Sequence, residues 1–189
     1  EKDTPEEKIK ILYDNFMDME ARNAAGIAPI AEDLQRIDAV RSVSELDDVM
    51  IQADSRSALS LLTDFTLTID EMDSGRYLTL LEPASAELTK QVYSGESEVQ
   101  KKAYLKYISS FLTLCGEAKE EAQKNAQDFF AFEKQLSDAS LTIAEQYDPG
   151  KTYNIYTLNE LKKIFSDVDI QRAFDETGLS ESSRIKVSD

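Results

Sequence analysis

The sequence contains no histidine and a single cysteine among its 189 residues. Without an imidazole the chain cannot build a Ser-His-Asp or Cys-His catalytic set, and it lacks the usual ligand of a zinc site. One cysteine cannot form an internal disulfide, and the position of Cys115 in the apolar run FLTLC predicts a buried, inert thiol. The common histidine-dependent mechanisms are therefore excluded for this chain by itself.

Glycine, proline and long apolar runs are also scarce. Six glycines and four prolines are too few for an all-β fold, which needs a turn about every ten residues. No apolar run approaches the roughly 20 residues that span a bilayer, and no signal peptide is visible. The chain begins with Glu1 directly before a predicted helix, so we expect an artificial start rather than a natural one. The composition, 41% hydrophobic and 31% charged, predicts a globular domain of long helices.

Basic residues are outnumbered by acidic ones. The chain has 21 Lys and Arg against 37 Asp and Glu, a formal net charge of −16. Such a surface repels phosphate backbones and anionic lipid headgroups, so we expect no nucleic acid and no membrane contact by this segment. The first interpretation of this acidity is that it keeps the protein soluble. The alternative is an electrostatic field that attracts basic substrates, which no charge cluster in the sequence favours.

Helix signals follow one another along most of the chain. Thr4, Pro5 and Glu7 combine an N-cap, a first-turn proline and an acid three residues after the cap. Similar capping pairs are Ser42 with Glu45, Ser97 with Gln100 and Thr157 with Glu160. Apolar residues at three- and four-residue steps predict helices at about 5–25, 29–40, 42–50, 59–62, 97–115, 117–147, 157–165 and 169–177.

The periodicity changes once. Residues 65–69 alternate apolar and polar side chains, as a half-buried strand does, and residues 77–81 can pair with them. We therefore predict a mainly α, multi-helix domain with one short β-hairpin at about residues 65–82. The domain is expected to span residues 1–178, and residues 179–189 form a polar tail that nothing anchors.

The acidic turn of this hairpin deserves comparison with a calcium loop. The ligand pattern needs an oxygen donor where Met72 stands and a strong acid where Ser74 stands. The pattern fails at Met72, so a hairpin turn is the better interpretation of residues 70–75.

Other groups capable of chemistry also have structural interpretations. Adjacent acids occur at Glu6-Glu7, Asp47-Asp48 and Glu120-Glu121, each on the polar face of a predicted helix, where acids are solvated. Most of the eight tyrosines lie on or beside apolar stripes, which is typical of half-buried rings in helical cores. We therefore predict no catalytic, cofactor-binding or metal-binding residue in this chain.

Three stretches, in order, resemble a known family. They are residues 8–37, residues 65–93, and the pair of blocks at 103–142 and 148–170, the last containing Tyr153, Asn154 and Thr157. Together they look like the N-terminal region of neprilysin and endothelin-converting-enzyme relatives. The family's Leu-Pro is absent near Leu88, and Ile170 stands where a Trp is common. Phe16 replaces the cysteine of animal members, which suggests a bacterial-type, disulfide-free relative.

The resemblance implies a two-lobed zinc endopeptidase. One lobe of such an enzyme holds zinc through H-E-x-x-H and a distant Glu; the other is helical, walls the active-site chamber and limits access to short peptides. This chain matches the helical lobe, so zinc is expected in the parent enzyme and no cofactor in this fragment. The implied partners are the catalytic lobe of the same polypeptide and short peptide substrates.

No functional residue is carried over from the family. Thr157 is expected to cap a helix and Asn154 to hold the turn before it; Tyr153 is also expected to be structural. Family members occur in several compartments; we expect the cell surface or exterior, with the cytoplasm as the alternative. A free-standing acidic helical protein-interaction domain without enzyme activity is the other function that the composition allows.

Overall fold

The computed structural model describes residues 4–57, 63–179 and 183–188. Its internal contacts divide the chain into two units, residues 1–39 and 40–189, which are described one at a time. The predicted short helix at about 59–62 lies outside the described residues.

The first unit consists of helices only: α1 (Pro5–Met17), α2 (Met19–Ala25), the 3-10 turn η1 (Ala28–Ile30) and α3 (Ala31–Ala39). Thr4 caps α1 as predicted, because its Oγ1 accepts a hydrogen bond from the Glu7 amide at 3.2 Å. The single helix predicted up to Gly26 is wrong. The Asp18 side chain accepts the Ala21 N–H at 2.9 Å, so a new helix begins at that carboxylate. No described residue of this unit is buried.

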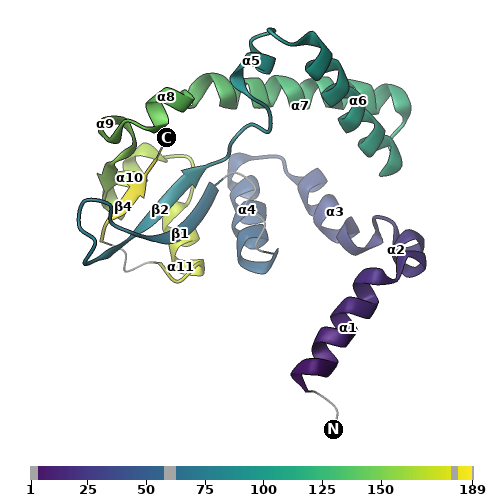
Figure 1. Cartoon of the computed structure of the whole chain (residues 1–189), viewed down its shortest axis with the longest axis horizontal. Coiled ribbons are helices and arrows are strands. Elements are labelled where there is room, and N and C mark those ends of the chain that lie inside the picture. Colours follow the sequence, from purple (N-terminus) through teal and green to yellow (C-terminus); the bar gives the residue numbers. More distant parts are fainter. Residues whose placement is uncertain (1–3, 58–62, 180–182, 189) are drawn as a thin grey trace. The chain divides into compact units, whose positions relative to one another are not determined.

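The second unit contains eight described helices and four described strands (Figure 1). The helices are α4 (Val43–Ser57), α5 (Lys90–Tyr93), α6 (Glu98–Leu114), α7 (Lys119–Ala139), α8 (Ile143–Gln146), α9 (Pro149–Thr152), α10 (Leu158–Ile164) and α11 (Ile170–Glu176). The strands are β1 (Thr63–Ile69), β2 (Tyr77–Pro83), β3 (Asn154–Tyr156) and β4 (Ile185–Val187). The mainly α class is confirmed.

The predicted hairpin is the beginning of a larger sheet. β1 and β2 pair antiparallel with Phe65 opposite Leu81, which confirms the hairpin. β4 then pairs parallel to β2, and β3 pairs antiparallel to β4, in the order β1-β2-β4-β3. The expectation that nothing anchors the tail is therefore wrong. Ile185 is fully buried because β4 lies inside the sheet.

One face of the sheet is covered by helices α10 and α11. Leu81 and Ile185 point to this face, and Leu161, Ile170 and Phe174 from the two helices pack on them. Phe65 meets Phe174 edge to face, with ring centroids 4.9 Å apart. Side chains alternate along a strand, so Leu80 and Lys186, neighbours in register, lie on the opposite face.

Helices α5, α6 and α7 form a second packed group in the same unit. Val92, Tyr93 and Phe130 are its buried centre, and the rings of Tyr93 and Phe130 lie 5.0 Å apart. The turn between α6 and α7 uses Gly116, whose φ of 106° is a conformation that side-chain-bearing residues rarely adopt. The predicted break at Gly116 is confirmed.

The ends of the long helix differ from the prediction. α7 stops at Ala139 rather than continuing to Tyr147, because Ser140 is extended and Thr142 starts α8 with a capping box. Asp148-Pro149-Gly150 begins the one-turn helix α9 instead of only ending a helix, since the Asp148 carboxylate accepts the Gly150 N–H at 2.9 Å. Local capping groups therefore override the continuous apolar stripe.

Two predicted caps differ in the structure and form a matched pair for mutation. Thr157 and Glu160 make both bonds of a capping box at α10, with the Glu160 N–H donating to Thr157 Oγ1 at 3.3 Å. Ser97 precedes α6 but its side chain makes no cap hydrogen bond. We expect Thr157→Ala to lower the free energy of unfolding by about 1 kcal/mol and Ser97→Ala to change it by less than about 0.5 kcal/mol in urea denaturation. Equal losses for the two variants would contradict this assignment of the caps.

Candidate functional site

The turn between β1 and β2 is fixed by the buried carboxylate of Asp70, which forms an ion pair with the half-buried Arg184. Asp70 is only 1% exposed. Its Oδ1 accepts hydrogen bonds from the Tyr153 hydroxyl at 2.7 Å and the Met72 N–H at 3.0 Å, and its Oδ2 accepts one from Arg184 at 3.0 Å. These partners come from the turn itself, from the residue before β3 and from the residue before β4. Asp70 therefore ties the hairpin to both later strands.

The protonation states of this cluster follow from those contacts. The Tyr153 hydroxyl bond, the Met72 N–H and Arg184 hold the pKa of Asp70 below its ordinary value, against the opposing effect of burial. Donation to Asp70, with burial, raises the pKa of Tyr153. A charged acceptor facing a cation and a protonated phenol is a structural lock. It confirms that residues 70–75 form a turn held by protein groups.

Acid titration tests the Asp70 lock. The pKa of Asp70 is lower in the folded chain than in the unfolded chain, where it is near 4. The ionised carboxylate therefore stabilises the fold at any pH above the unfolded-state pKa, and this stabilisation is lost as the pH falls through the folded-state pKa. We expect Asp70→Asn to lower stability at pH 7 and to flatten the remaining dependence of stability on pH below about 4. The exposed residue Asp167 gives the control Asp167→Asn. Identical acid profiles for wild type and Asp70→Asn, measured by denaturation at several pH values, would contradict the lock.

The neighbouring residues of the family-like block also have structural roles. The Asn154 side-chain amide donates to the carbonyl oxygens of Lys151 at 2.6 Å and Val187 at 3.2 Å, so it holds the turn before β3 and the end of β4. Thr157 caps α10. The predicted roles of Asn154 and Thr157 are confirmed.

A second buried carboxylate lies on α7. Glu133 Oε1 accepts hydrogen bonds from the Glu87 N–H at 3.2 Å and the Tyr104 hydroxyl at 3.1 Å. Burial, followed by the contact with Glu133, raises the pKa of Tyr104, and burial raises the pKa of Tyr93 to about 12. Both phenols stay protonated at neutral pH. Glu133 therefore joins α7 to α6 and to the segment before α5.

In one of the three acid pairs that were predicted to be solvated, one member is buried and the other is half-buried. Asp47 is buried and accepts the Asp169 N–H at 2.8 Å, and Asp48 pairs with Arg172. Both acids hold α4 against α11, a partnership across more than 120 residues that no local pattern announces. The prediction of a buried Cys115 is also wrong, since this thiol is only half-buried at the end of α6.

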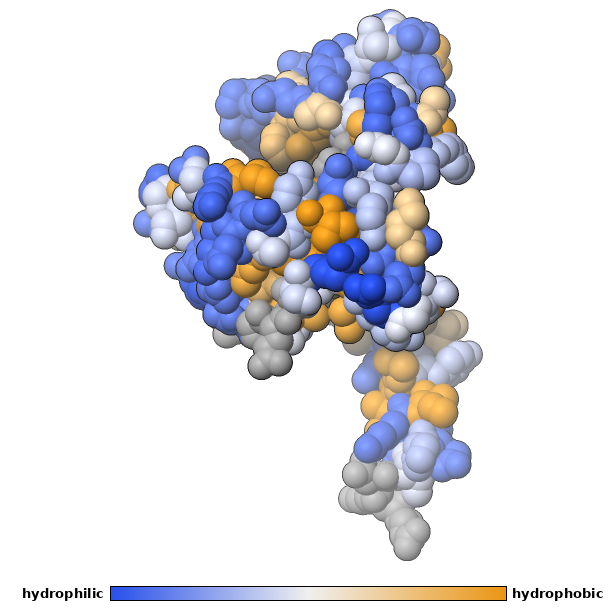
Figure 2. Space-filling model, turned by 90° about the vertical axis from the view of Figure 1, so that its left-hand side faces the viewer, coloured by the Kyte–Doolittle hydropathy of each residue, from blue (hydrophilic) through white to orange (hydrophobic). Residues whose placement is uncertain are grey.

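The described part of the second unit contains a groove of about 1200 Å³. The face of the sheet opposite α10 and α11 provides its floor through Leu80 and Lys186, and Phe129, Phe132 and Leu136 of α7 line one side. Figure 2 shows apolar side chains where the uppermost helices meet the part that contains the sheet. This groove is the candidate functional site.

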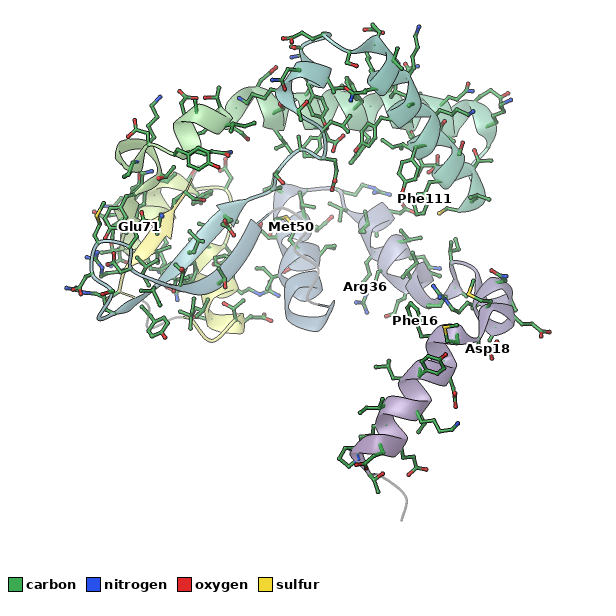
Figure 3. The ribbon with its side chains drawn as sticks, viewed as in Figure 1. Phe16, Asp18, Arg36, Met50, Glu71 and Phe111 are labelled. Atoms are coloured by element: carbon green, nitrogen blue, oxygen red, sulfur yellow. The ribbon has the colours of Figure 1, made fainter. Side chains whose placement is uncertain are left out.

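The lysines of the groove have partners, whereas two of its glutamates have no ion pair among the described residues. Lys186 pairs with Glu71, which lies in the β1–β2 turn (Figure 3), and Lys90 donates to the carbonyl of Ser140. Glu82 and Glu87 are exposed groove residues with no side-chain ion pair to the described part of the chain. The groove thus offers apolar surface and unneutralised carboxylates, without a nucleophile held beside a base.

Metal ligation is the remaining chemical possibility. Across residues 4–57, 63–179 and 183–188, no three His, Cys, Asp or Glu side chains are grouped so that they could hold a metal ion. In the same ranges no helix is both long and apolar enough to cross a bilayer. The absence of catalytic, cofactor and metal residues from the chain stays a prediction.

A family model and several solved structures match this chain. The N-terminal family model described as "Peptidase family M13" matches residues 1–189. The zinc metalloprotease Zmp1 of Mycobacterium tuberculosis in its open state superposes with a TM-score of 0.81 at 24% identity, over 94% of this chain and 28% of that one. The crystal structure of Zmp1 with an inhibitor gives 0.81 at 23% identity, with the same shares of the two chains. PepO from Lactobacillus rhamnosis HN001 gives 0.71 at 14% identity, over 87% of this chain and 27% of that one. No curated protein sequence matches.

These matches define the class and then the family. The fold is that of the helical N-terminal part of zinc metalloproteases, and the chain spans just over a quarter of the length of those solved structures. The chain belongs to peptidase family M13. The resemblance found in the sequence is confirmed.

Proposed function

We propose that residues 1–189 form the non-catalytic helical lobe of a zinc-dependent M13 endopeptidase, and that this lobe walls the active-site chamber and admits short peptides. The family match supports the parent activity. The catalytic lobe, in a later part of the same polypeptide, would supply zinc ligands and the reacting groups. This chain's residues would exclude water and bulky substrates from that chemistry.

The observation that carries the proposal is an apolar face of the first unit that no other described residue of that unit covers. Ile9, Leu12 and Phe16, spaced along one side of α1, are 68%, 71% and 65% exposed. Figure 3 shows Phe16 near the end of α1, and the lowest part of Figure 2, which is α1, carries apolar side chains at its surface. Such a face is unusual for a free-standing protein.

The energetics favour a partner on this face. A 13-residue helix is marginal in water without tertiary packing, and α1 has no buried residue. Burying a large apolar side chain stabilises by about 1.5–3 kcal/mol, so three such residues offer a substantial gain to any partner that covers them. The catalytic lobe of the same polypeptide is the partner we propose. A whole-chain family match favours this over a free-standing interaction domain.

Substrate size provides the functional test. The full-length parent should cleave a short peptide in a zinc-dependent manner, and attaching a folded domain to each end of that peptide should reduce cleavage by at least about tenfold, because a walled chamber excludes the domains. The matched control is the same peptide carrying flexible tails of equal length without folded domains. Equal cleavage of the domain-flanked and tail-flanked peptides would contradict the chamber.

The compartment belongs to the same proposal. We propose the cell surface or exterior for the parent enzyme, where short peptides would be its substrates; the cytoplasm is the alternative. Cell fractionation with an antibody against residues 1–189 distinguishes the two.

A further inference from the structure

The groove in the second unit is positioned where the chain leaves the sheet. β4 contributes Lys186 to the groove floor, and Ser188, directly after the strand, also lines the groove. The C-terminal end of the described chain lies beside α8, whose Ile143 lines the groove as well (Figure 1). Ser188, the last described residue, therefore brings the chain to the edge of this groove.

The groove also exposes large apolar side chains to water. Phe129 and Phe132 are 43% and 44% exposed, and Ile143 is 68% exposed, although all three line the same concavity. An apolar concavity that is open to water gains free energy when an apolar face covers it.

The charges restrict what the occupant can be. Both lysines of the groove have acceptors, Lys186 at Glu71 and Lys90 at Ser140. The carboxylates of Glu82 and Glu87 have no ion pair with the described residues and face an occupant unneutralised. Charge complementarity therefore calls for Lys or Arg beside an apolar stripe.

We propose that the polypeptide segment immediately following Asp189 in the parent enzyme occupies this groove as an amphipathic element. Its apolar side packs on Phe129, Phe132 and Ile143, and its basic residues face Glu82 and Glu87. The inference rests on the proposed function, because it requires a parent chain that continues past Asp189. It assigns the groove to the fold of the lobe itself rather than to substrate.

Photo-crosslinking in the full-length parent tests the occupant. A benzophenone amino acid at Phe132 should crosslink to a peptide within the first roughly 30 residues after Asp189, since a helix of about 20 residues already spans about 30 Å. The same probe at Phe111, which is exposed on α6 and outside the groove, should not capture that peptide. Crosslinks from Phe132 to a later segment, to a second molecule or to added substrate peptide, or no crosslink, would overturn the proposal.

A charge-reversed parent tests the electrostatic part. Glu82→Lys with Glu87→Lys should reduce the crosslink yield from Phe132 by about threefold, whereas Glu120→Lys with Glu121→Lys, on an exposed part of α7, should leave it unchanged. Equal yields in both double variants would contradict the charge assignment.

Zinc content and peptide cleavage of the unsubstituted parent are measured on the same preparation. A zinc-free, inactive parent with the expected crosslink would refute the proposed function and leave the groove assignment standing.

Discussion

Replacing Phe174 by alanine should cost about 3–5 kcal/mol of unfolding free energy. Phe174 is fully buried between the sheet and α10, and its ring meets Phe65 edge to face. The substitution removes the ring from a packed site whose neighbours lie on a sheet and two helices, so the cavity cannot close completely. The loss would be a large fraction of the 5–15 kcal/mol stability of an ordinary domain. Urea denaturation followed by circular dichroism measures it.

Phe111 provides the matched control. It is the same residue type, lies on α6 and is 53% exposed (Figure 3). Phe111→Ala should change the unfolding free energy by less than about 1 kcal/mol, since much of the ring is already in water. A loss for Phe174→Ala no larger than that for Phe111→Ala would show that the sheet is not covered by α11 as described.

Ending the chain at Gly178 should be even more damaging than the Phe174 substitution. This truncation removes β4, which lies between β2 and β3, and so leaves β3 without a partner strand and β2 paired only with β1. Loss of the buried Ile185 side chain alone is worth about 2–5 kcal/mol. Loss of Arg184 also leaves Asp70 without its cation. We expect the truncated chain to lose the cooperative unfolding transition of the second unit.

A full-length variant with a small change in β4 is the control for the truncation. Ile185→Val keeps β4 and should cost only about 0.5–1.5 kcal/mol. Hydrogen exchange would show the difference directly: protected amides in β2 should become exchangeable in the truncated chain and stay protected in Ile185→Val. A truncated chain with the wild-type transition and wild-type protection would mean that β4 contributes nothing to the sheet.

Features encoded over a few residues could be predicted from the sequence. The hairpin at 65–82 follows from period-two alternation, and the helix starts at Thr4 and Thr157 follow from capping patterns. The break at Gly116 follows from the backbone freedom of glycine. In each case the physical cause lies within one turn of the feature.

Features that depend on distant partners could not be predicted. β3 and β4 have three residues each, too few to show a period, and they form strands only because the hairpin edge accepts them. The Asp70–Arg184 pair joins residues 114 positions apart, and Asp47 reaches Asp169 across 122 positions. An acid in a polar run looks solvated until its partner is known. For this reason two buried carboxylates were missed.

The groove was also beyond the reach of sequence patterns. Phe129 and Phe132 belong to the apolar stripe and its margin on α7, where such rings are typical of a core. Only the position of the sheet relative to α7 and α8 within the second unit leaves them open to water. The family resemblance predicted a lobe without chemistry of its own but gave no indication of this surface.

Zinc analysis of two purified proteins tests the central claim most directly. The chain of residues 1–189 and the full-length parent would be dialysed against trace zinc, and bound metal and cleavage of a short peptide measured on each. The account predicts one zinc and chelator-sensitive cleavage for the parent, and neither stoichiometric zinc nor cleavage for residues 1–189, because these residues include no histidine. One firmly bound zinc with chelator-sensitive cleavage in residues 1–189, or a parent that holds none, would contradict it.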